Sequence, residues 1–385
     1  MADIEQSRKE FIDQTDVIHA VDGTGVETED TESEERITEP FDPTLIRVET
    51  KPMSMDLLIA RIRERELDLM PGFQRKAGIW SDAAQSRLIE SMLIRIPLPA
   101  FYMDATDEDK WLIVDGLQRL TTIKRFVIEK ELKLTGLEFL DQVEGKTFDE
   151  LPRAFQRRIN ETQVTVYLIE RDTPPEVKFN IFKRINTGGL PLSPQEIRHA
   201  LNQGKATELL SALANSSEFK KATDYGIQDK RMADQECVLR FMAFTISSYL
   251  DYKTKDFDNF LNRTMATINK MPEQKIEQLR KQFLRSMVAA YDLFGRYAFR
   301  KQYHRNTWRY PINKALFETW SVNLNHLDDR QLEELQIRKD TLIEKFIQLM
   351  NNRDFESAIS QGTGNIAKVR LRFSAIEHLL QEVLS

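Results

Sequence analysis

The chain has 385 residues, of which 41% are hydrophobic and 30% are charged, a balance typical of soluble globular proteins. This length exceeds the size at which one hydrophobic core usually stops growing, so we expect two domains. The single cysteine, Cys237, excludes an intrachain disulfide framework and a thiolate cluster for zinc or iron–sulfur, and it favours a reducing compartment. The five histidines are scattered and form no metal-binding pair at helical spacing.

The first 40 residues differ from the rest of the chain in charge. They contain thirteen acidic and three basic residues, a sum of −10, whereas the remaining 345 residues carry +4. With so few aliphatic residues, residues 1–42 are predicted to form a disordered acidic arm. The arm lacks the basic start and apolar core of a secretory signal, and no later apolar run is long enough to span a bilayer. We therefore expect a cytoplasmic protein without a membrane segment.

Regular patterning begins after the arm with a helix and a strand. Apolar residues at helical spacing predict a helix that begins near Met55, and a short apolar strand follows at 67–70. Residues 71–80 contain proline and glycine without periodicity and are predicted to form a loop. The hydroxyl of Ser81 can accept an unpaired backbone N–H, so Ser81 is predicted to cap a helix that ends before Pro97.

A strand–glycine–helix junction occupies the centre of this region. Strands at 98–103 and 111–114 flank an acidic turn and are predicted to form a hairpin or neighbouring strands of one sheet. The second strand runs directly into Asp115 and Gly116. Apolar residues then repeat at helical spacing from Leu120, so a helix begins within a residue or two of Gly116.

More strands and helices complete the α/β region. Strands are predicted at 132–134 and 164–169, separated by an arginine-rich helix. A pair of prolines opens another helix, which closes at the glycines 188–189. The sequence at 193–196 has the pattern of a capping box, and a helix is predicted to run from it to about Gly204.

From about residue 206 onward, helical stripes recur and period-two alternation is almost absent. No repeat of fixed length is evident, so we expect an irregular helical bundle. The sequence thus predicts an α+β protein in three parts. These are the arm at 1–42, an α/β domain at 43–205 and a large all-helical domain at 206–385.

The junction at Asp115 to Arg119 is the sharpest chemical signal. A helix N-terminus presents unpaired N–H groups where a phosphate can bind, and Gly116 would let the backbone approach closely. Arg119 could add a charge-assisted bond to phosphate oxygens, while Asp115 could hold a magnesium ion, orient Arg119 or position a water. The alternative is an ordinary helix start with a capping aspartate and a solvated arginine.

Two further polar elements each have an ordinary explanation when taken alone. Gln74 and Arg75 lie in the loop at 71–80, where functional side chains are often held, but taken alone they are better explained as ordinary surface. Arg184, Asn186 and the two glycines that follow mark the end of a helix, where a simple C-cap would use the same residues.

Together these motifs resemble a known family. The loop has Phe73-Gln74-Arg75 followed by Trp80, Ser91 and Ile96-Pro97; the junction has an Asp-Gly-x-Gln-Arg-Leu-Thr box at 115–121; and the third has Phe-x-Arg-Ile-Asn-Thr-Gly-Gly at 182–189 with Leu-Ser-x-x-Glu-Ile-Arg at 192–198. In this order they resemble the ParB/sulfiredoxin-like domain at the N-terminus of GmrSD-type modification-dependent restriction enzymes. The resemblance covers about residues 50–205.

This resemblance implies binding and hydrolysis of a nucleoside triphosphate with Mg²⁺, in DNA-related defence against phage. By analogy Gly116, Gln118 and Arg119 grip phosphates and Asp115 is the catalytic, metal- or water-positioning acid. The remaining nucleotide-binding residues implied are Gln74, Arg75, Arg184 and Asn186. Leu117 stands where the family usually has glutamine, so hydrolysis is less supported than binding.

The helical region contains no cluster of histidine and asparagine typical of an HNH nuclease, so DNA cleavage would require a partner protein or a nuclease site of another kind. It does contain a stretch in which basic and aromatic residues alternate, which can hold phosphates and stack on bases. The candidates for nucleic-acid contact are Arg300, Lys301, Arg305, Trp308 and Arg309. The alternative is a helix with buried aromatics and a solvated basic face.

Two other functions remain open from the sequence. One is a nucleotide switch that binds without hydrolysing. The other is a nucleic-acid-binding or partner-binding protein in which the α/β domain is only a scaffold.

Overall fold

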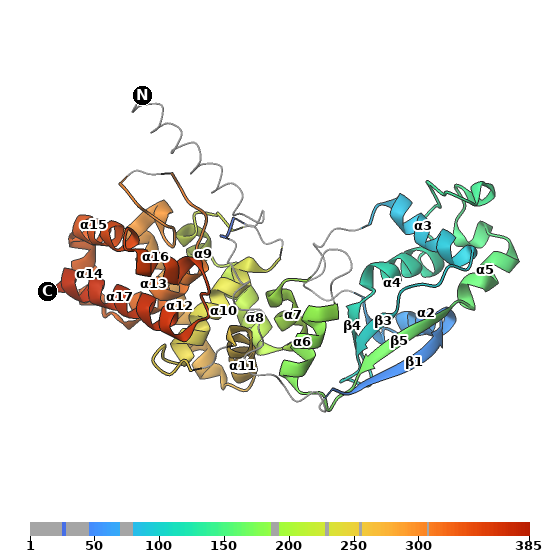
Figure 1. Cartoon of the computed structure of the whole chain (residues 1–385), viewed down its shortest axis with the longest axis horizontal. Helices are drawn as coiled ribbons and strands as arrows, with labels where there is room; N and C mark the ends of the chain where they lie inside the picture. Colours follow the sequence, from blue (N-terminus) through green and yellow to red (C-terminus); the bar gives the residue numbers. More distant parts are fainter. Residues whose placement is uncertain are drawn as a thin grey trace, which may run out of the picture. The chain divides into compact units, whose positions relative to one another are not determined.

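A computed structural model describes residues 25–27, 46–69, 80–185, 192–227, 231–253, 256–305 and 308–385. The chain divides into two compact units. The described residues within 41–201 form an α/β unit, and residues 25–27 together with the described residues within 202–385 form a helical unit (Figure 1). The mixed α and β composition and the helical C-terminal region expected from the sequence are confirmed. Among the described residues, no helix is both long and apolar enough to cross a membrane.

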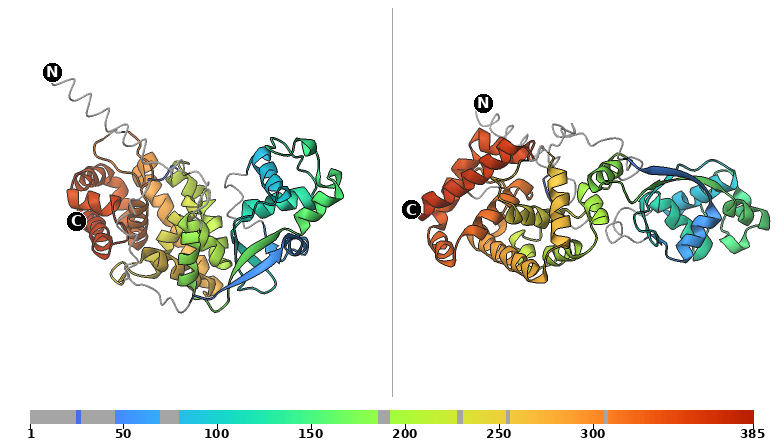
Figure 2. Two further views of the ribbon diagram at one scale, coloured as in Figure 1. Left: turned by 45° about the vertical axis from the view of Figure 1, so that its right-hand side comes forward. Right: turned by 90° about the horizontal axis from the view of Figure 1, so that it is seen from below.

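The α/β unit is built on a sheet whose strands, within the described residues, follow the order β1-β5-β3-β4-β2. The strands are β1 (Val48–Ser54), β2 (Leu67–Asp68), β3 (Phe101–Asp104), β4 (Trp111–Asp115) and β5 (Gln163–Ile169). β3 and β4 are antiparallel, which confirms the predicted hairpin, whereas β2 runs parallel to β4 and β3 parallel to β5. β1 and β5 pair antiparallel along their whole lengths and lie side by side (Figure 1, Figure 2).

Helices cover both faces of this sheet. The helices on one face are α2 (Met55–Arg63), α3 (Asp82–Leu93), α4 (Leu117–Ile123) and α5 (Arg153–Asn160). Those on the other are α6 (Pro175–Ile185) and α7 (Pro194–Leu201). Because side chains alternate along a strand, Ile113 of β4 enters the first core and Val114 enters the second. The centre of the sheet at β4 is therefore buried on both faces, whereas β1 is largely exposed.

Two predicted caps are confirmed. Ser81 accepts a hydrogen bond from the N–H of Ala84 at 3.3 Å, at the start of α3. At α7 the hydroxyl of Ser193 accepts from the N–H of Glu196 at 3.1 Å, and a carboxylate oxygen of Glu196 accepts from the N–H of Ser193 at 2.6 Å. These reciprocal bonds are the capping box that the sequence indicated.

Two strand predictions differ from the structure. β1 was not predicted, because its exposed residues carry no alternating apolar pattern and it is held by pairing with β5. The strand predicted at 132–134 is wrong: Leu132 and Leu134 are buried, but the segment is not a strand and pairs with no strand in the described part of the chain. Leu134 instead bonds the backbone of Gly145 and Lys146 in a local turn.

The helical unit packs around a large aromatic and aliphatic core. Phe283, Phe317 and Trp320 are almost completely buried in it. Its helices are α8 (Lys205–Ala214), α9 (Ser217–Ala222), α10 (Ala233–Ile246), α11 (Phe257–Asn269), α12 (Glu273–Phe294), α13 (Lys314–His326), α14 (Asp329–Ile337), α15 (Lys339–Met350), α16 (Arg353–Ser360) and α17 (Ile366–Leu384).

Candidate functional site

The strand–glycine–helix junction forms where the sequence predicts it. β4 ends at Asp115, and Gly116 joins it to α4 with a φ of 102°. A Cβ atom on Gly116 would lie 2.3 Å from Cδ1 of Phe101, which is closer than two carbon atoms can approach. Both the backbone angle and the nearby ring therefore require glycine.

Arg119 is turned into the protein. Its guanidinium donates to the carbonyl oxygens of Pro99 and Ala100 and, at 2.8 Å, to Oδ2 of Asp115, and it lies over the ring of Phe101. Only 10% of the side chain is exposed. Burial lowers the pKa of Arg119, and the neighbouring Asp115 carboxylate partly offsets this effect. These bonds hold the segment before β3 against α4, so they correct the expectation that Arg119 reaches out to a phosphate.

Asp115 keeps one oxygen for other partners. Oδ2 pairs with Arg119, whereas Oδ1 makes no hydrogen bond to the described residues, and 27% of the side chain is exposed. The described residues contain no group of three or more histidine, cysteine, aspartate or glutamate side chains that could hold a metal by themselves. A cation at Asp115 would thus take most of its ligands from water or from a bound substrate.

Gln118 connects the junction to the loop that contains the first motif. Its Oε1 accepts from the N–H of Trp80 at 3.4 Å, and Nε2 of Gln85 donates to the carbonyl of Trp80 at 2.7 Å. The Nε2 atom of Gln118 makes no hydrogen bond to the described residues. Gln74 and Arg75 precede Trp80 in sequence and lie outside the described residues.

The sheet topology also directs β2, the strand that precedes the segment 70–79, toward the junction at Gly116. β2 is parallel to β4, with Leu67 paired to Trp111 and Asp68 to Leu112. Since the two strands point the same way, the chain leaves β2 toward the end of the sheet where β4 reaches Asp115. Both flanks of the segment 70–79 therefore lead to the junction.

The third motif reaches this end of the sheet by way of α6. Lys178, near the start of α6, pairs with Asp104 at the C-terminal end of β3, and both side chains are buried. β3 and β4 are antiparallel, so Asp104 lies at the opposite end of the sheet from Asp115. α6 starts there and packs along the sheet through Phe182, so it carries exposed Arg184 back toward the end where β4 finishes. Asn186 lies outside the described residues.

The nucleic-acid hypothesis requires a correction for two residues in the helical unit. Arg300 is 2% exposed and donates to the carbonyls of Arg296, Tyr310 and Thr223. Burial lowers the pKa of Arg300 to about 10. Lys301 is 8% exposed. Both cations serve the interior of the unit and are not available to nucleic acid at its surface.

The three other residues of that hypothesis are at the surface. Trp308 is 66% exposed, which is unusual for so large an apolar side chain. Arg305 pairs with Glu344 at 2.9 Å, and Arg309 pairs with Asp224. The positive charges of Arg305 and Arg309 are therefore already balanced by acidic neighbours.

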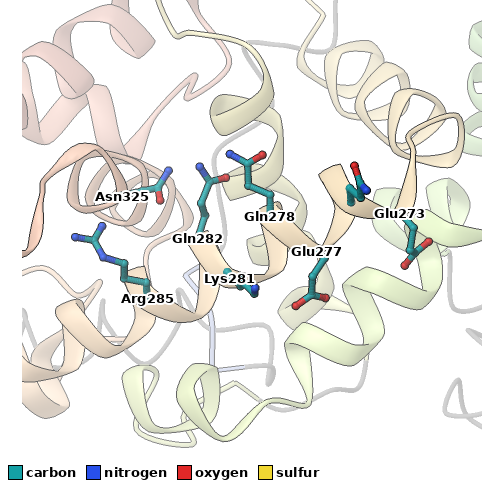
Figure 3. A pocket seen from close by; sticks show the side chains of 8 residues that line it. Glu273, Glu277, Gln278, Lys281, Gln282, Arg285 and Asn325 are labelled. Atoms are coloured by element: carbon teal, nitrogen blue, oxygen red, sulfur yellow. The ribbon is translucent and has the colours of Figure 1, made fainter.

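A cavity of about 700 Å³ lies elsewhere on the helical unit (Figure 3). Its lining residues are Glu273, Gln274, Glu277, Gln278, Lys281, Gln282 and Arg285 of α12 and Asn325 of α13. None of the predicted site residues is among them. The lining mixes both charges and offers no single chemical preference.

Comparison with known families finds a match to the region that contains the three motifs. Residues 57–203 match the N-terminal domain of GmrSD restriction endonucleases. The match includes all of β2 to α7 and ends beside the boundary of the α/β unit, so the resemblance seen in the sequence is confirmed for this region. The comparison with curated proteins finds no match.

Sequence reasoning missed Phe101 and the carbonyls of Pro99 and Ala100. An apolar side chain and two backbone oxygens carry no chemical signal in a sequence. Their role at the junction becomes visible only when β3 is placed beside α4.

Proposed function

We propose that the α/β unit binds a nucleoside triphosphate with Mg²⁺ at the end of the sheet where β4 meets α4, and that it hydrolyses this nucleotide. The observation that carries the proposal is that the flanks of all three motifs lead to this end. β2 and Trp80 bring the first motif, Gly116 forms the second, and α6 brings the third. Separate motifs that converge at the end of strands in an α/β unit are typical of a ligand site.

The polar groups at this end have complementary tasks. Oδ1 of Asp115 is the atom that would meet Mg²⁺ through water or orient the attacking water. Nε2 of Gln118 and the guanidinium of Arg184 would contact phosphate oxygens, together with Gln74, Arg75 and Asn186. Arg119 acts as a positioning residue, because it fixes Asp115 and the backbone at Pro99. Leu117 packs against the main core of the unit, so it offers no polar group for hydrolysis.

The biological setting that we propose is a restriction or phage-defence system, because the matched family is a domain of restriction endonucleases. We assign to the α/β unit the ParB/sulfiredoxin-like fold that the motifs imply. DNA cleavage would be carried out by a partner nuclease. Nucleotide binding would then control whether that partner nuclease is active.

The direct test is equilibrium binding of fluorescent ATP and GTP analogues in the presence of Mg²⁺. Arg184→Ala and Gln118→Ala should each weaken binding about tenfold or more, because each removes a hydrogen bond to a charged group. Arg63→Ala is the matched control: Arg63 is also exposed, but it lies at the end of α2 that leads into β2, away from Asp115. Failure of the wild-type chain to bind either nucleotide at millimolar concentration would overturn the proposal.

Hydrolysis is tested separately by release of inorganic phosphate. Asp115→Asn should abolish turnover while it retains most of the binding, since the amide keeps one acceptor but no charge. Binding without phosphate release by the wild type would indicate a nucleotide switch instead.

One observation favours a second candidate function, contact with DNA by the helical unit. Trp308 is highly exposed and is followed by Arg309. Trp308→Ala should then weaken binding to single-stranded DNA about tenfold, the usual loss for one stacked base. Equal affinity of the variant and the wild type would remove this candidate.

A further inference from the structure

A short piece of the acidic N-terminal segment is packed into the helical unit. The N–H of Ile312 donates to the carbonyl of Gly25 at 3.1 Å, and the N–H of Glu27 donates to the carbonyl of Ile312 at 2.8 Å. Val26 therefore pairs with Ile312 as a parallel β-bridge, and its side chain is only 2% exposed. These three residues depart from the disorder expected for residues 1–42.

The fit of Gly25 is specific for a residue without a side chain. Its φ is +81°, and a Cβ atom on it would lie 1.8 Å from the carbonyl oxygen of Gly226. Gly226 in turn is closely covered, because a Cβ there would lie 2.5 Å from the guanidinium of Arg300. Backbone meets backbone at this point, so only glycine allows the approach.

Glu27 is bound at both carboxylate oxygens. Nζ of Lys301 lies 2.7 Å from Oε1, and Nδ2 of Asn313 donates to Oε2 at 3.0 Å. Lys301 and Asn313 are 8% and 2% exposed, and the side chain of Glu27 is 16% exposed. A buried cation and a buried amide that hold one carboxylate form a selective acid-binding site.

The walls of this site are held by bonds that do not involve the N-terminal segment. Lys301 also contacts the hydroxyl of Ser360 at 2.7 Å and Glu356 at 3.5 Å. Asn313 also donates from its backbone N–H to the carbonyl of Phe299 at 2.9 Å and from Nδ2 to that of Ile359 at 2.8 Å. The pocket can therefore persist when the segment leaves.

We propose that the helical unit contains a peptide-binding slot, occupied in cis by Gly25–Val26–Glu27 of the same chain. The slot selects a peptide with glycine, an aliphatic residue and an acidic residue, in that order. Ile312 supplies the β-strand contacts, the core receives the aliphatic side chain, and Lys301 with Asn313 binds the acid. Strand addition combined with side-chain pockets is a general mode of peptide recognition. The N-terminal segment is thus a displaceable ligand of its own chain.

The first test is hydrogen exchange on the full-length wild-type chain. The amides of Glu27 and Ile312 should both be protected. A synthetic peptide with the sequence of residues 20–32, added in excess, should raise exchange at Glu27 at least tenfold while Ile312 stays protected, because the carbonyl of the incoming glycine replaces that of Gly25. A peptide that carries Val26→Asp should change neither amide. Fast exchange at both amides without peptide would overturn the proposal.

The second test removes the competition from the tethered segment, whose effective concentration is of millimolar order. The full-length variant Glu27→Lys should bind the labelled wild-type peptide at least tenfold more tightly than the wild-type chain does. Glu49→Lys, the same charge change on exposed β1, should bind it as weakly as wild type. If Glu27→Lys melts at a much lower temperature, the peptide should restore the melting temperature in trans. Absence of both binding and restoration would refute the slot.

Discussion

The guanidinium of Arg119 lies over the ring of Phe101, with 4.4 Å between its central carbon and the ring centroid. The same ring fills the space that a side chain at Gly116 would need. One buried phenylalanine therefore fixes both the backbone turn and the arginine that orients Asp115. The geometry of the candidate nucleotide site depends on this apolar contact as much as on its polar groups.

Replacement of Arg119 should destabilise the α/β unit. Arg119→Ala removes three hydrogen bonds and leaves two carbonyls and Asp115 without their donor, so we expect a loss of about 2–3 kcal/mol in the free energy of unfolding. Arg119→Lys should recover little of it, because an ammonium cannot reproduce the planar set of donors. Urea unfolding provides the measurement. Stability within error of wild type for Arg119→Ala would show that these bonds contribute nothing.

Gly116→Ala should be more costly than Gly145→Ala. Both residues have positive φ, but a Cβ on Gly145 meets nothing within 4 Å, whereas one on Gly116 collides with Phe101. We expect about 1 kcal/mol of lost stability at Gly145 from backbone strain alone. At Gly116 steric overlap should add about 1–3 kcal/mol. Thermal unfolding of the two variants measures the difference, and equal melting temperatures would contradict it.

The core of the helical unit contains a buried ion pair, Arg372 with Glu318, in which neither side chain is exposed. Arg372→Ala should lower the free energy of unfolding by about 3–5 kcal/mol, because it leaves a buried carboxylate without this partner. Lys345→Ala breaks the surface pair with Glu382 and should have little effect. Similar denaturation midpoints for the two variants would show that the buried pair is dispensable.

Stability at acid pH should depend on Glu90. Burial raises the pKa of Glu90, but hydrogen bonds from the N–H groups of Glu138, Phe139 and Leu140 outweigh it, and the pKa lies below its usual value of 4.5. A lowered folded-state pKa means that this stabilisation is complete above pH 4.5 and is lost as the pH falls through the lower, folded-state value.

Glu90→Gln, which cannot titrate, should therefore be less stable than wild type at neutral pH, and the difference should shrink as the pH falls below 4.5. Urea unfolding of both proteins from neutral to acid pH measures this difference in the free energy of unfolding. A difference that stays constant over this range would exclude a role for the ionised carboxylate.

Local sequence determined the parts of the fold that depend on neighbouring residues. The caps at Ser81 and Ser193, the hairpin of β3 and β4, and the turn at Gly116 are all visible in short stretches of sequence. The order of the motifs was enough to indicate the family that residues 57–203 match. These features follow from backbone geometry and side-chain spacing, which a sequence displays directly.

Only the tertiary structure decided which cations face the surface. Arg119, Arg300 and Lys301 read as ligand-binding residues in the sequence, yet each is buried and bonded inside its unit. Likewise, nothing in the acidic composition of residues 1–42 distinguishes Val26, whose burial depends on Ile312 far along the chain. A long basic side chain can either point into solvent or donate hydrogen bonds to a distant backbone carbonyl. Which of the two occurs depends on tertiary contacts that the local sequence does not contain.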